Sequence, residues 1–376
     1  MTIRAQIAVV GLGAAGAPAL WQLARAGCDV VGIDRFAPPH DRGSSHGQTR
    51  LLRVAYAEGA RYVPFVRRAI ALWREIEAES GTRLFHQTGV FYAGDARSEF
   101  LSSSMASAAV YDVGLQILDK RSEVTCGLRV PADWTAFVEL EGGFVEAERA
   151  ITAFVEVAKR AGARLLTGTK VAAIVPHASG VEIRAGGETI HVEKVVVAAG
   201  AWTGELVPEL RPHLAIERRV LHWFADPTGA CALSAGFKPF IVEAGDGIEF
   251  YGFPSIDGRG VKAGEHDLRV GGASHVDAAD ALDRAVGVDE VARIAQMVRR
   301  FLPGLEGPTS SAVCMYPMSK DSDFILDRLS ERVIVGAGLS GHGFKFAPAM
   351  GEALAALALG RAPTLDLSYL SLKRFG

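Results

Sequence analysis

Cysteine is scarce in this chain, and neither sign of charge is in excess. The four cysteines stand far apart among 376 residues, so neither a CxxC redox motif nor a zinc-ribbon spacing occurs. A disulfide framework is not expected, and the composition fits a reducing compartment such as the cytoplasm. The formal net charge is −3, from 40 basic and 43 acidic residues. This balance gives no general field that would attract nucleic acid or an anionic membrane, so any basic site must be local.

Charged residues are also absent between Ala5 and Ala24, and a signal peptide or a membrane helix could contain such a run. The glycine spacing within the run argues against both. In QIAVVGLGAAGAPALWQLARAGCDVVGID an apolar strand, a glycine turn, a small-residue helix and a second strand follow one another. The pattern predicts a βαβ crossover with strands over 6–10 and 29–33 and a helix over 14–26. No targeting or membrane segment is expected.

Three glycines of this crossover, Gly11, Gly13 and Gly16, follow the first strand and open the helix. Without side chains, they let backbone amides approach a pyrophosphate at the positive end of the helix. Asp34 closes the second strand, 18 residues after Gly16, where a carboxylate can accept hydrogen bonds from ribose hydroxyls. A tight turn alone would also explain the glycines. The surrounding pattern favours a dinucleotide site, but it does not separate FAD from NAD.

Further along the chain, periodicity predicts helices over 61–79 and 97–109, and EGGFVEAERAITAFVEVAKRAGARLLTG predicts a turn, a helix and a strand. Residues 170–192 alternate like a hairpin, and KVVVAAG follows as a buried strand of the nucleotide-binding sheet. Alternating stretches from 216 to 307 predict an antiparallel sheet, with a helix around 288–302. The end of the chain returns to an α/β pattern, with ERVIVGAG as a strand and AMGEALAALALG as a helix.

Residues 38–53, PPHDRGSSHGQTRLLR, are rich in small and polar side chains that rarely form core. Their backbone amides can face a cofactor, with His46, Arg50 and Arg53 projecting nearby. Four blocks, beginning with GSSHGQTRLLR in this segment, resemble the monomeric sarcosine oxidase and N-methyltryptophan oxidase family of flavoenzymes, within the D-amino-acid-oxidase-like group. The other three are YGFPSIDGRGVKAGEH, CMYPMSKDSDFILD and GLSGHGFKFAPAMGE. The resemblance extends through nearly the whole chain.

The resemblance implies an FAD whose 8α-methyl group is bonded to a cysteine sulfur, and it places that cysteine at Cys314. A thiolate is a competent nucleophile toward an electrophilic flavin methyl group, and the bond would raise the reduction potential of the flavin. Spacing alone would make Cys314 a buried, inert cysteine. No metal site is expected. The glycine motif and the resemblance together assign FAD binding to Gly11, Gly13, Ala15, Gly16, Asp34, Ser44, Ser45, Arg50, Val171, Gly200, Trp202, Cys314, Gly338, Gly341, Gly343 and Lys345.

Lys262 in GVKAGEH lies on a predicted strand, and alternation points it away from its apolar neighbours Val261 and Ala263. A generic strand lysine would be solvated, but the family has a lysine here as the site of dioxygen activation. A fixed cation beside flavin N5 stabilises the negative charge that develops on oxygen. The resemblance therefore implies a catalytic role for Lys262, with Arg50 and His46 assigned beside it.

Arg53 and Lys345 correspond to the family's clamp for the substrate carboxylate, and two converging cations would supply both orientation and affinity. Arg53 could instead pair with a surface carboxylate such as Glu58, and Lys345 could cap the preceding loop. The resemblance also implies that the substrate cavity is lined by Tyr251, His266 and Tyr316.

The resemblance therefore predicts FAD-dependent oxidation of a secondary amino acid, sarcosine or another N-methyl amino acid. A hydride equivalent passes to the flavin, the imine that results is hydrolysed, and dioxygen is reduced to hydrogen peroxide. Three alternatives stay open. They are a flavin dehydrogenase that passes electrons from a cyclic or D-amino acid to another acceptor, a non-catalytic nucleotide-binding module, and an NAD-dependent dehydrogenase, which would leave Cys314 unexplained. A monomer is expected, because no heptad or long apolar stripe demands a partner.

The predicted fold class is α/β, a Rossmann-type FAD-binding domain with an inserted, mainly antiparallel β substrate domain. The FAD-binding domain is expected from three separated segments, 1–84, 145–215 and 308–376. The substrate domain is expected from 85–144 and 216–307.

Overall fold

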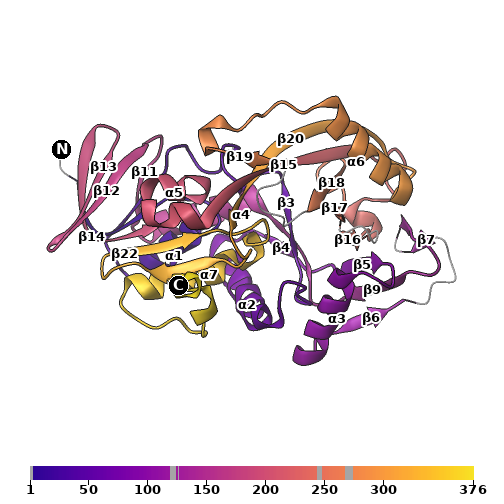
Figure 1. Ribbon diagram of the computed structural model, residues 1–376, viewed down its shortest axis with the longest axis horizontal. Helices are drawn as coiled ribbons and strands as arrows, with labels where there is room; N and C mark the ends of the chain where they lie inside the picture. Colours follow the sequence, from indigo (N-terminus) through magenta and orange to yellow (C-terminus); the bar gives the residue numbers. More distant parts are fainter. Residues whose placement is uncertain (1–2, 119–123, 126, 244–247, 267–273) are drawn as a thin grey trace.

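Two large sheets organise the chain in a computed structural model, which describes residues 3–118, 124–125, 127–243, 248–266 and 274–376. Figure 1 shows the first sheet in the left half of the view and the second in the right half. The first sheet has eight strands in the order β11-β2-β1-β14-β13-β12, with β22 beside β14 and β21 beside β22. These strands are β1 (Ile3–Val10), β2 (Val30–Ile33), β11 (Arg164–Leu166), β12 (Val171–His177), β13 (Gly180–Ala185), β14 (Glu188–Val197), β21 (Ile325–Arg328) and β22 (Val333–Ala337).

Parallel pairing in the centre of this sheet confirms the predicted α/β class. β1 pairs in parallel with both β2 and β14, and β14 pairs in parallel with β22. The predicted βαβ crossover is β1, α1 and β2. The helices of the described residues are α1 (Gly16–Arg25), α2 (Val63–Ser80), α3 (Glu99–Tyr111), α4 (Ala147–Arg160), α5 (Thr203–Leu206), α6 (Val288–Phe301) and α7 (Ala347–Ala358).

The hairpin predicted over 170–192 is larger than expected. β12 and β13 form one antiparallel pair, and β13 and β14 form a second. β14 runs without a break into the KVVVAAG segment, so the last arm of the hairpin and the predicted buried strand are one strand. Exposure alternates along its first half, whereas Val195, Val196 and Val197 are fully buried between β1 and β22. The change from alternating to continuous hydrophobicity along one strand explains why the sequence predicted two elements.

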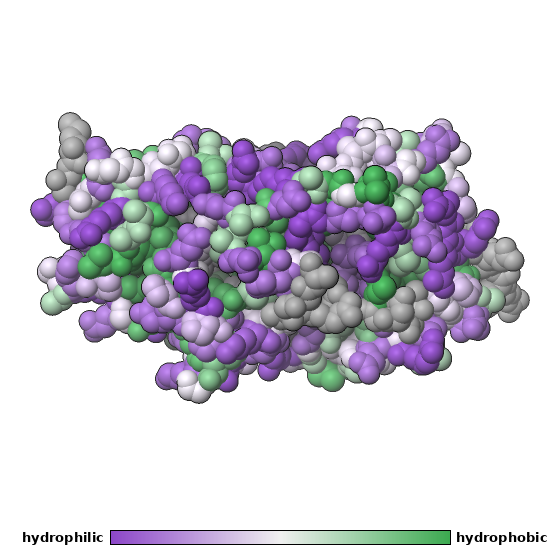
Figure 2. All heavy atoms as spheres, turned by 45° about the horizontal axis from the view of Figure 1, so that its top comes forward, coloured by the Kyte–Doolittle hydropathy of each residue, from purple (hydrophilic) through white to green (hydrophobic). Residues whose placement is uncertain are grey.

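Among the residues that the structure describes, no helix is both long enough and apolar enough to cross a bilayer. On the face drawn in Figure 2, hydrophilic residues predominate and hydrophobic ones form small scattered groups.

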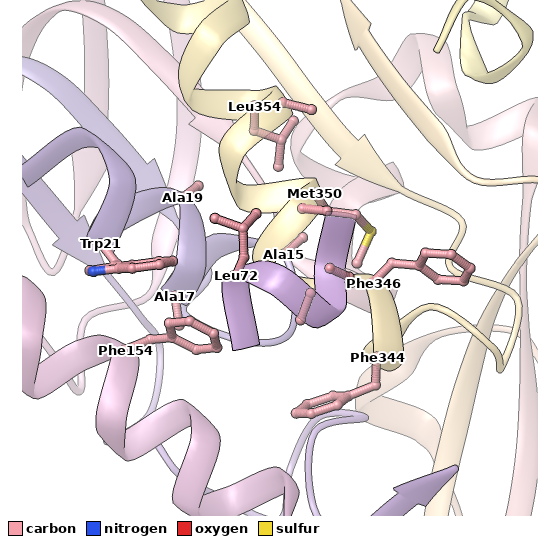
Figure 3. Close-up of a cluster of buried hydrophobic side chains, with 14 of the residues drawn as sticks. Ala15, Ala17, Ala19, Trp21, Leu72, Phe154, Phe344, Phe346, Met350 and Leu354 are labelled. Carbon is pink, nitrogen blue, oxygen red and sulfur yellow. The ribbon is translucent and has the colours of Figure 1, made fainter. Parts of the chain in front are cut away.

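The core between the helices and the first sheet depends on small side chains of α1. Figure 3 shows Ala15, Ala17 and Ala19 facing large residues of the neighbouring helices, and Trp21 lying beside Phe154 of α4. The Trp21 and Phe154 ring centroids are 5.5 Å apart. On the other side, α1 contacts α7 so closely that a Cβ on Gly351 would lie 2.4 Å from the Pro18 carbonyl carbon. This packing fixes the N-terminal end of α1, where the glycine turn lies.

The second sheet has nine strands in the order β19-β15-β18-β17-β16-β5-β9-β6, with β20 paired to β15. Its neighbours are antiparallel except for β16 and β5, so the predicted mainly antiparallel sheet is present. Its strands are β5 (Val90–Gly94), β6 (Leu115–Ile117), β9 (Thr135–Glu139), β15 (Leu214–Ala225), β16 (Phe240–Glu243), β17 (Glu249–Phe253), β18 (Val261–His266), β19 (His275–Val276) and β20 (Glu306–Ser319).

Strand β20 belongs to this second sheet along its length, because it pairs with β15 from Glu306 to Ser319. The ribbon of β15 and β20 returns the chain to the first sheet. The predicted domain boundaries, including the one at 308, stay predictions.

The two faces of the second sheet have different surroundings. Phe250, Val261 and Ala263 pack with Ile294 and Phe301 of α6 in one hydrophobic cluster. Residues of the opposite face point toward a small sheet of β3 (Thr49–Leu52), β10 (Gly143–Glu146) and β4 (Phe85–His86). The remaining described strands, β7 (Val124–Thr125) and β8 (Leu128–Arg129), pair with each other. The opposite face is the one that carries the candidate site.

Candidate functional site

A cavity of about 1360 Å³ opens along the carboxyl ends of β1 and β2 and extends toward the second sheet. Most predicted FAD-binding residues lie on its wall. Gly16 lies under the glycine turn, and Cys314 and Lys345 line an adjoining cavity instead. The predicted residues on the wall are Gly11, Gly13, Ala15, Asp34, Ser44, Ser45, Arg50, Val171, Gly200, Trp202, Gly338, Gly341 and Gly343.

The glycine turn has the close approaches that its sequence predicts. Gly11 has φ +88°, and a Cβ there would lie 2.5 Å from the Ala198 carbonyl oxygen. A Cβ on Gly16 would lie 1.7 Å from the Gly11 carbonyl oxygen, so neither position can carry a side chain. The turn thus presents bare backbone at the N-terminal end of α1, a donor set that fits the pyrophosphate of FAD.

Asp34 holds this turn from the end of β2. One carboxylate oxygen accepts the Leu12 amide hydrogen at 2.7 Å, and the other accepts the Phe36 amide hydrogen at 2.8 Å. The side chain also lines the cavity, beside His40 at 3.4 Å. Asp34 therefore shapes the nucleotide end of the cavity and lies where a ribose would bind.

The second cavity, of about 610 Å³, lies between β3 and the face of the second sheet that is turned away from α6. It shares Arg50, Tyr316, Gly341 and Phe344 with the first cavity, so the two cavities adjoin. The structure brings together nearly all predicted catalytic and substrate residues here, namely Arg50, Arg53, Tyr251, Lys262, His266, Tyr316 and Lys345, and with them Cys314, the predicted attachment point of the flavin.

His46 differs, because it is not among the described residues that line either cavity. Its side chain is buried, and Nε2 has no hydrogen-bond partner among the described residues. Burial and the Arg50 charge lower the pKa of His46 to about 4, so the imidazole is neutral. His46 instead holds Arg50 in position through its backbone, since its carbonyl oxygen accepts a hydrogen bond from Arg50 at 2.5 Å.

Lys262 lies on β18 with its side chain pointing away from Val261 and Ala263, as the alternation predicted. It is 1% exposed, and Nζ donates to the carbonyl oxygens of Gly47 at 2.7 Å and Thr49 at 2.6 Å. Burial, followed by the Arg50 charge, lowers the pKa of Lys262 well below its ordinary value. The two carbonyl acceptors oppose this effect because they favour the ammonium form.

Arg50 fixes the polar loop that precedes β3 and approaches Cys314. Its guanidinium donates to the carbonyl oxygens of Ser44 and Thr49, both at 2.8 Å. One of its nitrogens lies 4.0 Å from the Cys314 sulfur, and the thiol also lies 3.8 Å from the Ser44 carbonyl oxygen. Arg50 therefore lies between the polar loop and the Cys314 sulfur.

Arg53 is 3% exposed and forms an ion pair with Glu58 at 2.5 Å. The alternative pairing considered from the sequence is therefore present, although the Glu58 side chain is only 13% exposed and is not a surface group. Burial opposes ionisation of Glu58, but the Arg53 charge outweighs it and holds the pKa of Glu58 well below its usual range. Arg53 Nη1 and Glu58 Oε2 have no hydrogen-bond partner among the described residues. Each is free to meet a ligand.

Lys345 lies in a short turn before α7, and its side chain and that of Arg53 both lie near the Tyr56 ring. The Arg53 guanidinium carbon is 4.9 Å and the Lys345 nitrogen 5.0 Å from the centroid of Tyr56. Lys345 donates to the His342 carbonyl oxygen at 2.9 Å and to the Tyr56 hydroxyl at 3.4 Å. Burial and the Arg53 charge lower the pKa of Lys345 to about 7. Two buried cations near one aromatic ring, Arg53 and Lys345, can bind an anionic group.

Tyr251, His266 and Tyr316 form the wall opposite this cation pair. His266 Nδ1 lies 3.3 Å from the Tyr316 hydroxyl, and burial lowers the pKa of His266 to about 3, which keeps it neutral. Gly341 has φ +76°, and a Cβ there would lie 2.3 Å from the Tyr316 ring. Glycine is thus required at Gly341 for the Tyr316 ring to reach the junction of the two cavities.

Three groups of this site were not identified from the sequence. Tyr56 and His342 share a 2.5 Å hydrogen bond beneath Lys345. Glu148 at the start of α4 accepts the amide hydrogens of Gly47 and Gln48, at 2.7 Å and 3.0 Å, and so holds the carbonyl that Lys262 contacts. His342 stands inside the GLSGHGFKF block, which was a usable signal, whereas nothing local marks Tyr56 or Glu148.

Comparison with known proteins agrees with this geometry. Residues 6–357 match the family model described as FAD dependent oxidoreductase. N-methyl-L-tryptophan oxidase of Yersinia pestis (strain Pestoides F) is 38% identical over 371 residues, covering 98% of each chain. Two solved structures share the fold. NikD, an amino acid oxidase essential for nikkomycin biosynthesis, has a TM-score of 0.85 at 24% identity and covers 98% of each chain. Glycine oxidase from Geobacillus kaustophilus has a TM-score of 0.81 at 22% identity and covers 99% of each chain.

The match spans the glycine turn, both sheets and most of α7. The chain belongs to the FAD-dependent oxidoreductase family.

Proposed function

We propose that this protein oxidises an N-methyl amino acid, sarcosine or a larger one, and uses dioxygen as the electron acceptor. The observation that carries the proposal is the pair of buried cations, Arg53 and Lys345, in a cavity that adjoins the predicted FAD cavity. The full-length similarity to N-methyl-L-tryptophan oxidase supports the same substrate class.

The substrate carboxylate is the natural ligand of this cation pair. Arg53 Nη1 is buried without a partner among the described residues, and the Lys345 nitrogen lies 5.0 Å from the centroid of the Tyr56 ring that Arg53 also contacts. A carboxylate bound there neutralises the excess positive charge and accepts the unmade hydrogen bond. This contact orients the amine end of the substrate toward the junction with the FAD cavity, where Tyr316 and Arg50 lie.

When bound, FAD supplies the hydride acceptor for the amine carbon and then passes the electrons to dioxygen, which yields hydrogen peroxide. Lys262 lies fully buried near the same junction, fixed by two carbonyl oxygens. Its ammonium is positioned to stabilise negative charge that develops on oxygen.

We also propose that Cys314 is the covalent attachment point. Its sulfur lines the substrate cavity near the junction, 1% exposed, with the Arg50 guanidinium 4.0 Å away. The three cysteines in the described residues are free, which supports a reducing compartment such as the cytoplasm. We expect the protein to act there as a monomer.

A peroxide-release screen tests the proposal. The panel contains sarcosine, larger N-methyl amino acids, pipecolate, proline and primary D-amino acids. Peroxide release with N-methyl amino acids is the expected result. Turnover with an artificial electron acceptor but without peroxide would indicate a dehydrogenase, and turnover confined to pipecolate, proline or D-amino acids would overturn the assigned substrate class.

A further inference from the structure

A row of polar groups that the proposed chemistry does not use lies on the second sheet, next to residues that line the substrate cavity. Glu249 on β17 stands opposite His266 on β18 and opposite Glu243 on β16 in the sheet register. The neighbouring row contains Tyr251 with Ile241, and both line the substrate cavity, as His266 does. Because side chains two residues apart on a strand share a face, Glu249 lies on the cavity side of the sheet, one row beyond Tyr251, although it is not among the described residues that line the cavity.

Burial along β17 agrees with this orientation. Phe250 is fully buried in the cluster under α6, on the opposite face of the sheet. Glu249 and Tyr251 are both partly exposed, as expected of side chains that border a cavity. His266, the neighbour of Glu249 on the same row, lines the cavity directly.

The polar atoms of this row are only partly satisfied. Glu243 is engaged, since it accepts hydrogen bonds from the Ser98 hydroxyl and the Phe100 amide at the start of α3. In contrast, Glu249 Oε2 and His266 Nε2 are buried and have no hydrogen-bond partner among the described residues. His266 lines the same cavity as Arg53, whose Nη1 is also orphaned, and Glu249 is the neighbour of His266 on its row. Together these orphaned atoms indicate a ligand with polar groups at two places.

The charges around Glu249 determine its protonation state, and therefore which polar group of a ligand it can bind. Burial raises the pKa of Glu249 to about 8, Arg53 and Lys345 oppose the rise, and Glu58 and Glu243 add to it. Glu249 therefore carries its proton at neutral pH, and a substrate carboxylate on the cation pair would favour the protonated form further. A neutral carboxyl group offers a carbonyl oxygen to a hydrogen-bond donor.

We propose that Glu249 is a specificity-determining residue that accepts a hydrogen bond from an N–H group on the substrate's side chain. This inference rests on the proposed function, because the carboxylate clamp fixes the end of the substrate from which the side chain extends. The favoured substrate class is then N-methyl amino acids with an N–H group in the side chain. The indole of N-methyl-L-tryptophan is a suitable probe, since a relative of this chain is named for that substrate.

The test compares N-methyl-L-tryptophan with N-methyl-L-3-benzothienylalanine, in which sulfur replaces the indole N–H. The readout is the ratio of the two kcat/KM values. For the wild-type holoenzyme we expect about tenfold preference for the indole, the value of one hydrogen bond. Glu249→Leu should bring the ratio close to one, and Glu249→Gln should retain the preference because its amide keeps the carbonyl acceptor.

A matched control lies one strand away. Glu265 points to the other face of β18 and pairs with Arg293 at 2.8 Å, outside the cavity. Glu265→Leu should keep the wild-type ratio. The flavin absorption spectrum of each variant shows that it is folded and loaded.

Equal kcat/KM for the two substrates in the wild type would overturn the inference, even if Glu249→Leu failed to fold. A preference that survives in Glu249→Leu would also overturn it, since the donor would then be recognised elsewhere. The proposed function fails separately, namely if neither these two substrates nor sarcosine gives turnover.

Discussion

The Arg53→Met variant tests two roles of the buried Arg53–Glu58 ion pair. One role is to stabilise the fold, and the other is to bind the substrate. The arginine is 3% and the Glu58 side chain 13% exposed, and the pair is 2.5 Å long. Loss of the guanidinium leaves a buried carboxylate without compensation, which costs about 3–5 kcal/mol of stability. The double variant Arg53→Met/Glu58→Gln removes both charges and should recover most of that loss.

Substrate binding should respond differently. In both variants kcat/KM for sarcosine should fall by about 10²–10³-fold, the range for one lost partner of a buried charge pair. The assays are the apparent unfolding midpoint of the holoenzyme and steady-state peroxide release. Arg61→Met is the control, because Arg61 pairs with Asp323 with half of its side chain exposed and should cost less than about 1 kcal/mol. If the double variant regains both stability and kcat/KM, Arg53 only stabilises the fold, and the proposal that it binds the substrate carboxylate is wrong.

Three further predictions concern other groups of the site. Cys314→Ser should release the yellow chromophore into the supernatant after acid denaturation, whereas the wild type should keep it on the precipitated protein; release from both would refute the covalent bond. Lys262→Met should slow reoxidation of the reduced flavin by dioxygen by about 10²–10³-fold in stopped flow, with Arg259→Met as the control, and an unchanged rate would remove Lys262 from oxygen chemistry. Because the pKa of Lys345 is lowered to about 7, its charge is lost as the pH rises through that value. Propionate should therefore bind more weakly above pH 7, by up to about tenfold per pH unit, and Lys345→Met should abolish this dependence; a flat wild-type profile would contradict it.

The fold was predictable where one period of hydrophobicity held over a whole element. The crossover of β1, α1 and β2 is such a case, since buried strands flank a small-residue helix. β14 is the counterexample, because its pattern changes from alternating to continuous where it passes between β1 and β22. A local pattern cannot show that a strand gains neighbours partway along its length.

The site was predictable where the chemistry depends on one residue in a recognisable block. Lys262, Arg53 and Cys314 came from such blocks and meet in one cavity. The burial of Glu58 and the orphaned oxygen of Glu249 depend instead on side chains distant in sequence. His46 shows the opposite error, since its block is near the cofactor cavity while its imidazole points elsewhere. Proximity in sequence to a binding loop does not fix the direction of a side chain.

The most direct test of the account is an anaerobic reduction of the purified holoenzyme by an N-methyl amino acid. We predict that the visible absorption of the oxidised flavin bleaches on mixing, and that dioxygen then restores it with the release of hydrogen peroxide. A folded, flavin-loaded protein whose absorption does not change with sarcosine, N-methyl-L-alanine or N-methyl-L-tryptophan would contradict the central claim.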